Sequence, residues 1–151
     1  HEEIGYNFCF TEMQAAIGIS QLNKLSRIIN KKNKIYARYL RQLSILSDHL
    51  SFPQTSPLCD PVYWFTSILT ERKNELKEFM SMNNIQTRDF FYPMHLQPCY
   101  KNIIHSKGHD GNSFYVSKKI YNEGLSLPSS YNLSIKDQDY VIHHILKFFN
   151  T

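Results

Sequence analysis

The chain has 151 residues, of which 42% are hydrophobic and 20% charged, and its formal net charge is +4. These values are typical of an ordinary soluble globular domain with its own core. No apolar run approaches the roughly 20 residues of a membrane-spanning helix, and three cysteines without close spacing argue against a disulfide framework or a zinc knuckle. We therefore expect a reducing, cytoplasmic setting and no membrane span.

A capping box marks the expected start of the first helix. Thr11 and Gln14 stand three residues apart, so each side chain can bond the other residue's backbone N–H. An apolar stripe at helical spacing follows and continues beyond Asn30 and Asn33, where we expect a bend. The pattern predicts one long helix, or two in series, from about Thr11 to Asp48.

The middle of the chain predicts a strand, a helix and a second strand. Residues 51–61 hold three prolines and no periodicity, which indicates a loop. Residues 62–69 are β-branched and aromatic, as in a buried strand. Residues 71–83 place apolar side chains on one helical face, and residues 85–88 resemble a short strand.

The last third begins with a long irregular segment, residues 90–113, which holds prolines and glycines. Loops of this length inside a compact domain are often functional. A helix over 113–123 should end at Gly124, followed by a short extended piece over 125–128. Ser134 is placed to cap the last helix. This order predicts an α/β fold, a small sheet covered by helices and entered by a long helix, but periodicity assigns no function.

Three passages add a resemblance. They are GYNFCFTEMQAAIG (5–18), TRDFFYPMHLQPCY (87–100) and GLSLPS (124–129). In this order they resemble passages of the DegT/DnrJ/EryC1/StrS family of pyridoxal-phosphate (PLP) sugar aminotransferases. The second passage, with Tyr63-Trp64 upstream, is most similar to perosamine-synthetase-like members, which act on a nucleotide-linked 4-keto-6-deoxyhexose.

The resemblance implies the small carboxyl-terminal domain of a fold-type I, aspartate aminotransferase-like enzyme. Residues 1–50 would be a lead-in segment and long helix that link from a large domain, and residues 51–151 the small α/β domain. The family's Schiff-base lysine lies upstream of the GYN passage. We therefore expect it to lie outside this chain, which starts at His1, and we expect the chain alone to show no turnover.

Asn7 is the residue that the resemblance assigns to the cofactor. In the family, the asparagine of the GYN passage reaches across a homodimer to the PLP phosphate of the neighbouring subunit. A side-chain amide supplies two hydrogen-bond donors, which suits a phosphate oxygen. The alternative is a turn asparagine before a helix.

Arg88, Tyr92 and His95 are the candidate substrate-binding residues. Arg88 can pair with a nucleotide phosphate, and Tyr92 and His95 can hydrogen-bond the sugar or its diphosphate from the proline-flanked loop. The alternatives are a solvated charge at a strand end and a surface-loop histidine.

Two further features bear on anion binding at Cys9 and on metal binding by His105 and His109. Cys9 stands where many family members have arginine, and cysteine cannot form a bidentate anion contact. His105 and His109 have a spacing that suits metal ligands on a helix, but the nearby glycines predict a loop. We expect no metal site.

For a complete enzyme, the resemblance implies amino transfer from glutamate to a nucleotide-linked keto-deoxy sugar in surface polysaccharide biosynthesis. Two other interpretations of the function stay open. The chain can be a non-catalytic remnant or dimerisation module of such an enzyme. It can also be a helical nucleic-acid binder built on the basic segment 24–41, although no recognition-helix motif is visible.

Overall fold

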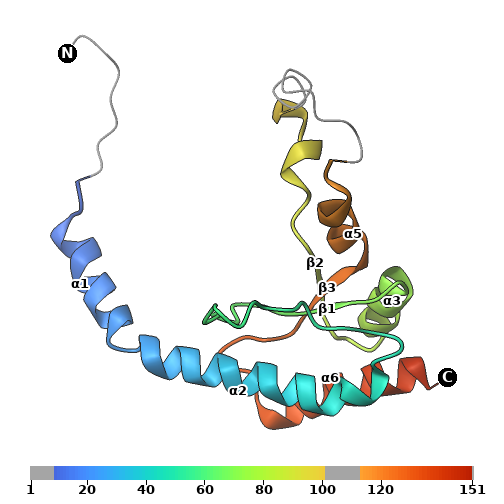
Figure 1. The fold of residues 1–151 in the computed structure, drawn as a ribbon. Helices are drawn as coiled ribbons and strands as arrows, with labels where there is room; N and C mark the ends of the chain where they lie inside the picture. The colour runs from blue at the N-terminus through green and yellow to red at the C-terminus, as the bar shows by residue number, and fades with distance from the viewer. Residues whose placement is uncertain (1–8, 101–112, 151) are drawn as a thin grey trace.

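The computed structural model describes residues 9–100 and 113–150, and an antiparallel sheet of three strands lies at its centre (Figure 1). The strand order is β1-β3-β2. The strands are β1 (Thr66–Leu69), β2 (Arg88–Asp89) and β3 (Gly124–Leu127). The helices are α1 (Glu12–Leu22), α2 (Leu25–Leu43), α3 (Lys73–Met82), α5 (Tyr115–Glu123) and α6 (Ile135–Phe149), with 3-10 turns η1 (Ser44–Leu46), η2 (Met94–Leu96) and η3 (Pro98–Tyr100).

The expected long helix is two helices in series, α1 and α2. The capping box at the start of α1 is confirmed, because Thr11 Oγ1 accepts from the Gln14 N–H and Gln14 Oε1 from the Thr11 N–H. The predicted bend at Asn30 and Asn33 is wrong: α2 runs unbroken through both, and the chain turns at Asn23 instead. Both asparagines are exposed, and an exposed asparagine costs a helix only a few tenths of a kcal/mol.

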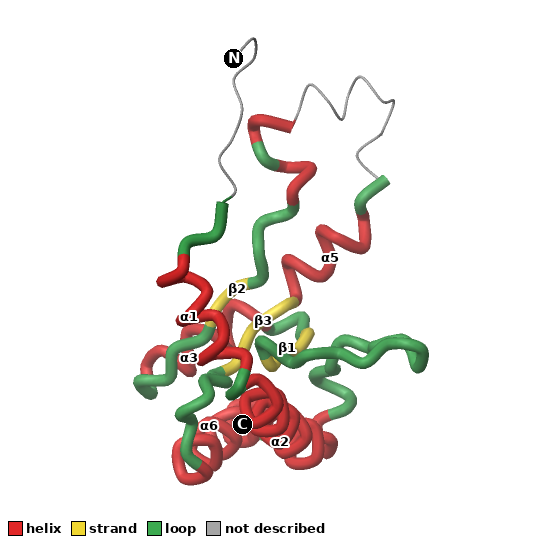
Figure 2. Tube along the Cα trace, turned by 90° about the vertical axis from the view of Figure 1, so that its left-hand side faces the viewer, coloured by secondary structure: helices red, strands yellow, loops and turns green. Residues whose placement is uncertain are grey.

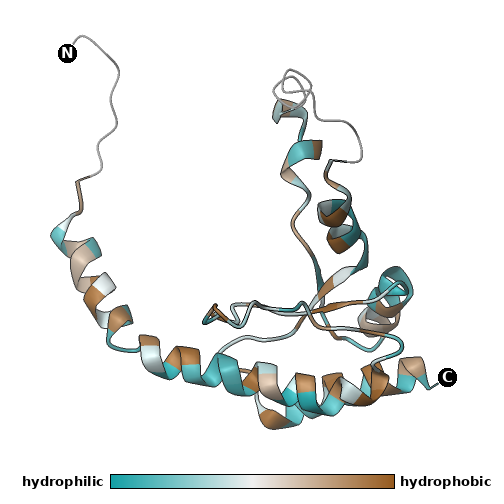
Figure 3. Ribbon diagram, in the orientation of Figure 1, coloured by the Kyte–Doolittle hydropathy of each residue, from teal (hydrophilic) through white to brown (hydrophobic). Residues whose placement is uncertain are grey.

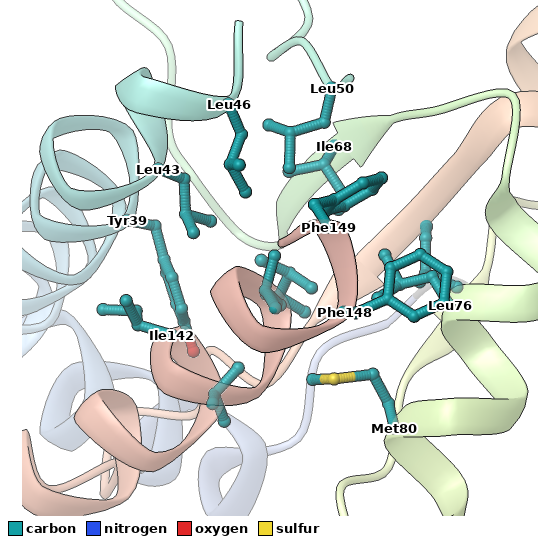
Figure 4. Packing of buried hydrophobic residues seen from close by; sticks show 14 of the residues in the cluster. Tyr39, Leu43, Leu46, Leu50, Ile68, Leu76, Met80, Ile142, Phe148 and Phe149 are labelled. Carbon is teal, nitrogen blue, oxygen red and sulfur yellow. The ribbon is translucent and has the colours of Figure 1, made fainter. Parts of the chain in front are cut away.

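The core lies between the sheet and helices α2, α3 and α6. Figure 4 shows side chains from all of these elements pointing together, and Figure 2 shows α2 and α6 side by side below the strands. Ile68 and Leu125 face each other in the register and are fully buried. Successive residues of a strand point to opposite faces, so Ser67 and Ser126 lie on the other face, next to α5.

The first strand is shorter than predicted. Residues 62–65 lie in a loop, and only Thr66–Leu69 pair with β3. The partner strand ends before Pro128, which has no N–H to donate. The Thr66 N–H instead donates to Ser129 Oγ over 3.2 Å.

The second strand starts three residues later than predicted, at Arg88. Ile85 is 5% exposed and belongs to the core, so the segment before β2 first packs against the helices. Asn84 makes the turn out of α3 with a φ of 58°. Asparagine adopts this left-handed conformation more readily than most residues, and helices often end in this way.

The carboxyl-terminal elements exist as predicted, but the extended piece expected over 125–128 lies one residue earlier and α5 begins at Tyr115. Residues 124–127 form β3, the central strand of the sheet, and Ser134 Oγ caps α6 by accepting from the Asp137 N–H over 3.1 Å. By contrast, α1 contains no buried residue, and its large apolar residues are exposed. Figure 3 shows these hydrophobic positions along a helix that stands apart from the sheet. None of the helices in the described ranges is long and apolar enough to cross a membrane.

Candidate functional site

Residues 90–100 and α5 form an arm that rises from the sheet (Figure 1). Aromatic contacts join its two sides. The Tyr92 ring meets Tyr121 edge-on at 5.4 Å, and the His95 ring is stacked on Phe114 with centroids 4.3 Å apart and planes 15° apart. Within the segment expected to be irregular, residues 90–100 therefore have a defined path, with the short turns η2 and η3.

His95 is half-buried, and its Nε2 is fully buried with no hydrogen-bond partner within the described part of the chain. Buried polar atoms in folded proteins almost always have a partner. The stacked ring of Phe114 holds the imidazole in one plane. The hydrogen-bonding capacity of Nε2 is therefore unused among the described residues.

Tyr92 lies three residues before His95 on the same side of the arm. Its side chain is 46% exposed, while its ring packs against Tyr121 of α5. The ring is thus fixed, and the residue still faces solvent. Of the three candidate substrate-binding residues, the structure brings Tyr92 and His95 together in one short segment.

Arg88 lies at the base of the arm, in β2, where it pairs with Ser126. It lines two cavities, of about 720 Å³ and about 600 Å³. The larger is lined by both polar and apolar side chains, and the smaller is bounded by aromatic and aliphatic side chains of the arm, such as Phe90 and Ile120. Among the described residues, Arg88 makes no hydrogen bond or ion pair, so its guanidinium donors are unused.

Lys32 is the second cation of the larger cavity, but its ammonium is already engaged. It donates to the Trp64 carbonyl over 2.7 Å and to the Ser129 carbonyl over 2.6 Å. Burial lowers the pKa of this ammonium. Lys32 ties α2 to residues beside β1 and β3 and uses two of its three N–H donors, whereas Arg88 has all its guanidinium donors unused among the described residues.

Asp89, the neighbour of Arg88, is held by two lysines of α3. Its carboxylate pairs with Lys77 and, over 3.2 Å, with Lys73. Lys73 is 6% exposed and also donates to the Tyr121 carbonyl over 2.7 Å. The hydrogen bond from Lys77 lowers the pKa of Asp89, burial opposes this, and Lys73 adds to the lowering. The cluster links β2, α3 and α5.

Acid should weaken the fold through Asp89. A carboxyl whose pKa is lower in the folded state stabilises the fold above its unfolded pKa of about 4, and the contribution is lost as pH falls through the folded pKa. We expect the stability difference between the natural protein and Asp89→Asn to shrink between about pH 5 and pH 2. Urea unfolding at a series of pH values measures it. A difference that stays constant over this range would contradict the assignment.

Other predicted site residues stand apart from this group. Asn7 lies outside the described residues, as do His105 and His109. Within the described residues there is no cluster of three or more His, Cys, Asp or Glu side chains that can hold a metal ion. Cys9 is described and exposed.

Sequence reasoning missed the partners that fix these side chains. Phe114 falls within the helix predicted over 113–123, and it lies at the N-cap of α5, where its ring supports that of His95. Lys73 and Lys77 are four residues apart, which places both on one face of a helix. This spacing could have indicated a shared carboxylate partner. The sequence does not show which carboxylate this is, because Asp89 meets the two lysines only when β2 is in place beside α3.

Comparison with known proteins decides the family. The model of the DegT/DnrJ/EryC1/StrS aminotransferase family matches residues 1–146, nearly the whole chain. The chain belongs to this family. The resemblance inferred from the three sequence passages is thereby confirmed.

Relatives of this family member include named sugar aminotransferases. GDP-perosamine synthase of Vibrio cholerae is 29% identical, over 99% of this chain and 40% of that protein. The Streptomyces venezuelae dTDP-3-amino-3,4,6-trideoxy-alpha-D-glucose transaminase is 34% identical, over 85% of this chain and 33% of that protein. The chain thus spans about two fifths or less of the length of these relatives.

Solved structures of sugar aminotransferases and of this family support the fold. The structure of S. venezuelae DesV matches with a TM-score of 0.86 and 28% identity, over 100% of this chain and 40% of that chain. An aminotransferase of the same family from Brucella abortus matches with a TM-score of 0.76 and 27% identity, over 91% of this chain and 35% of that chain. The predicted α/β fold, that of the small C-terminal domain of these enzymes, is confirmed.

Proposed function

We propose that this chain forms the C-terminal part of a PLP-dependent aminotransferase that transfers an amino group from glutamate to a nucleotide-linked keto-deoxy sugar of the perosamine type. The observation that carries the proposal is the 29% identity to GDP-perosamine synthases of Vibrio cholerae and Escherichia coli O157:H7 over 99% of the chain. Surface polysaccharide biosynthesis and a cytoplasmic setting belong to the same proposal.

PLP, when bound, supplies the electron sink for amino transfer. Asn7 is the residue of this chain proposed to hold its phosphate, across the interface of a homodimer. The lysines near the described site are engaged elsewhere: Lys32 with two carbonyls, and Lys73 and Lys77 with Asp89. This supports a Schiff-base lysine supplied from outside the chain and a chain that is inactive alone.

The described residues fit the sugar-nucleotide side of the site. Among the described residues, Arg88 has unused guanidinium donors beside a cavity that Lys32 and Ser129 also line, where a diphosphate can be bound in a bidentate manner. His95 has a buried Nε2 without a partner among the described residues, and Tyr92, three residues earlier, has its ring fixed against Tyr121 while it stays half-exposed. These groups bind and orient substrate, and none of them is proposed to transfer the proton.

The division into a lead-in segment over residues 1–50 and a small domain over 51–151 is part of the proposal. Its linking helix also contributes to the core, because Ile35, Tyr39 and Leu43 of α2 are buried with α6. The exposed apolar stripe of α1 is then the part of the lead-in segment left for contacts with a large domain.

Spectroscopy of the complete polypeptide, loaded with PLP, tests this function. We expect glutamate to change the absorbance of the bound cofactor and a 4-keto nucleotide sugar to reverse the change. Alanine at Asn7 should weaken PLP retention, measured by equilibrium dialysis. If glutamate leaves the absorbance unchanged while PLP is bound, the non-catalytic remnant or dimerisation module is the correct alternative.

A further inference from the structure

We propose that Asp89 is a positioning residue: held by Lys73 and Lys77 on the α3 side of β2, it turns the Arg88 guanidinium to the opposite side, where the substrate anion binds. This inference rests on the proposed function, because it assigns Arg88 to the nucleotide diphosphate. It adds a residue group, Asp89 with its two lysines, that the family resemblance does not supply.

Few pairings hold β2 in the sheet, so contacts of its side chains contribute to its position. The strand has two residues, and only the pairs Arg88–Ser126 and Asp89–Leu125 join it to the sheet. It is an edge strand in the order β1-β3-β2. Neighbouring residues of a strand point to opposite faces, so whatever fixes the Asp89 side chain also fixes the direction of Arg88.

The contacts of Asp89 fix it firmly. Lys77 pairs with one carboxylate oxygen and Lys73 with the other, the latter over 3.2 Å. Lys73 is itself nearly buried, donates to the Tyr121 carbonyl over 2.7 Å and lies 4.9 Å from the Tyr121 ring centroid. The edge strand is therefore attached to α3 and α5 and not only to β3.

The same contacts leave the charge of Arg88 available. The nearest carboxylate in sequence is committed to two ammonium groups, so it does not neutralise the guanidinium. Among the described residues Arg88 has no hydrogen bond or ion pair, and it lines both cavities at the base of the arm. Asp89 also borders the smaller cavity, and Asp137, whose carboxylate accepts from the Ser134 hydroxyl, borders the larger. A guanidinium without an ion-pair partner can donate two parallel hydrogen bonds to the oxygens of a diphosphate.

A double-mutant cycle on the complete polypeptide tests the inference. The measurement is the dissociation constant of a nucleoside diphosphate by calorimetry, with GDP, UDP and dTDP compared first and the tightest ligand used. We expect Arg88→Gln to weaken binding by about tenfold, the loss of a charged hydrogen-bond pair. Asp89→Asn should weaken it by about fivefold, and in the Arg88→Gln background it should add nothing.

The outcomes distinguish the substrate role of Arg88 from the positioning role of Asp89. If Arg88→Gln leaves the affinity unchanged, the proposed substrate role of Arg88 is wrong. If Arg88→Gln weakens binding but Asp89→Asn has no effect, or has its full effect in both backgrounds, the positioning role is wrong. Asp89→Glu, which retains a carboxylate within reach of the lysines, should restore part of the affinity. Glu78→Gln removes an exposed carboxylate of α3 and serves as the charge control.

Discussion

Replacing Gly124 by alanine should destabilise the domain by about 3 kcal/mol, because there is no room for a side chain at this position. A Cβ there would lie 2.4 Å from the Ile120 carbonyl oxygen and 2.7 Å from the ring of Phe90. The carbonyl belongs to the α5 backbone and cannot rotate away as a flexible side chain can. Urea unfolding followed by circular dichroism measures the loss.

Gly18 provides the matched control. It lies in α1, and a Cβ at that position would meet nothing within 4 Å. Gly18→Ala should therefore be neutral or stabilising by about 0.5 kcal/mol, as for alanine in a helix interior. Equal stability of the Gly124→Ala and natural proteins would show that β3 and α5 are not packed as described.

Tyr39→Ala should cost about 3 to 5 kcal/mol, the range for removing a large buried aromatic side chain. Tyr39 is fully buried in the core, and its hydroxyl donates to the Pro128 carbonyl over 2.9 Å. Tyr39→Phe keeps the ring and loses only this hydrogen bond, so it should cost about 1 kcal/mol. Thermal and urea unfolding of both variants give the two values.

Alkaline pH provides an independent check on the Tyr39 hydroxyl. Burial raises the pKa of this phenol, so the folded protein keeps the proton that an unfolded tyrosine loses near pH 10. The stabilisation is complete below that pH and is lost as pH rises toward the folded pKa. Tyr39→Phe should lack this part of the alkaline destabilisation. The same alkaline profile in both proteins would contradict the burial of the hydroxyl.

Local signals in the sequence predicted most elements of the fold. The capping groups of Thr11 and Ser134 lie within three residues of their partners, so they are visible without a structure. Strand limits were less predictable, since β1 begins only opposite Leu127, the last residue of its partner before Pro128. The bend in the first helix was misplaced, because it depends on where α2 gains buried contacts and α1 has none.

Some residues of the candidate site could be predicted from the sequence, and others could not. Motif resemblance selected Arg88, Tyr92 and His95, and the structure places them at the base and along one side of a single arm. Motifs could not select Phe114, because ring stacking between segments far apart in sequence leaves no local pattern.

A crystal structure of the complete polypeptide with PLP and a nucleoside diphosphate tests the central claim most directly. We expect the Arg88 guanidinium and His95 Nε2 within about 3 Å of ligand oxygens, and Asn7 of the partner subunit at the PLP phosphate. A structure in which Asn7 and the loop around His95 lie on unrelated surfaces, both within one subunit and across the dimer, would contradict the account.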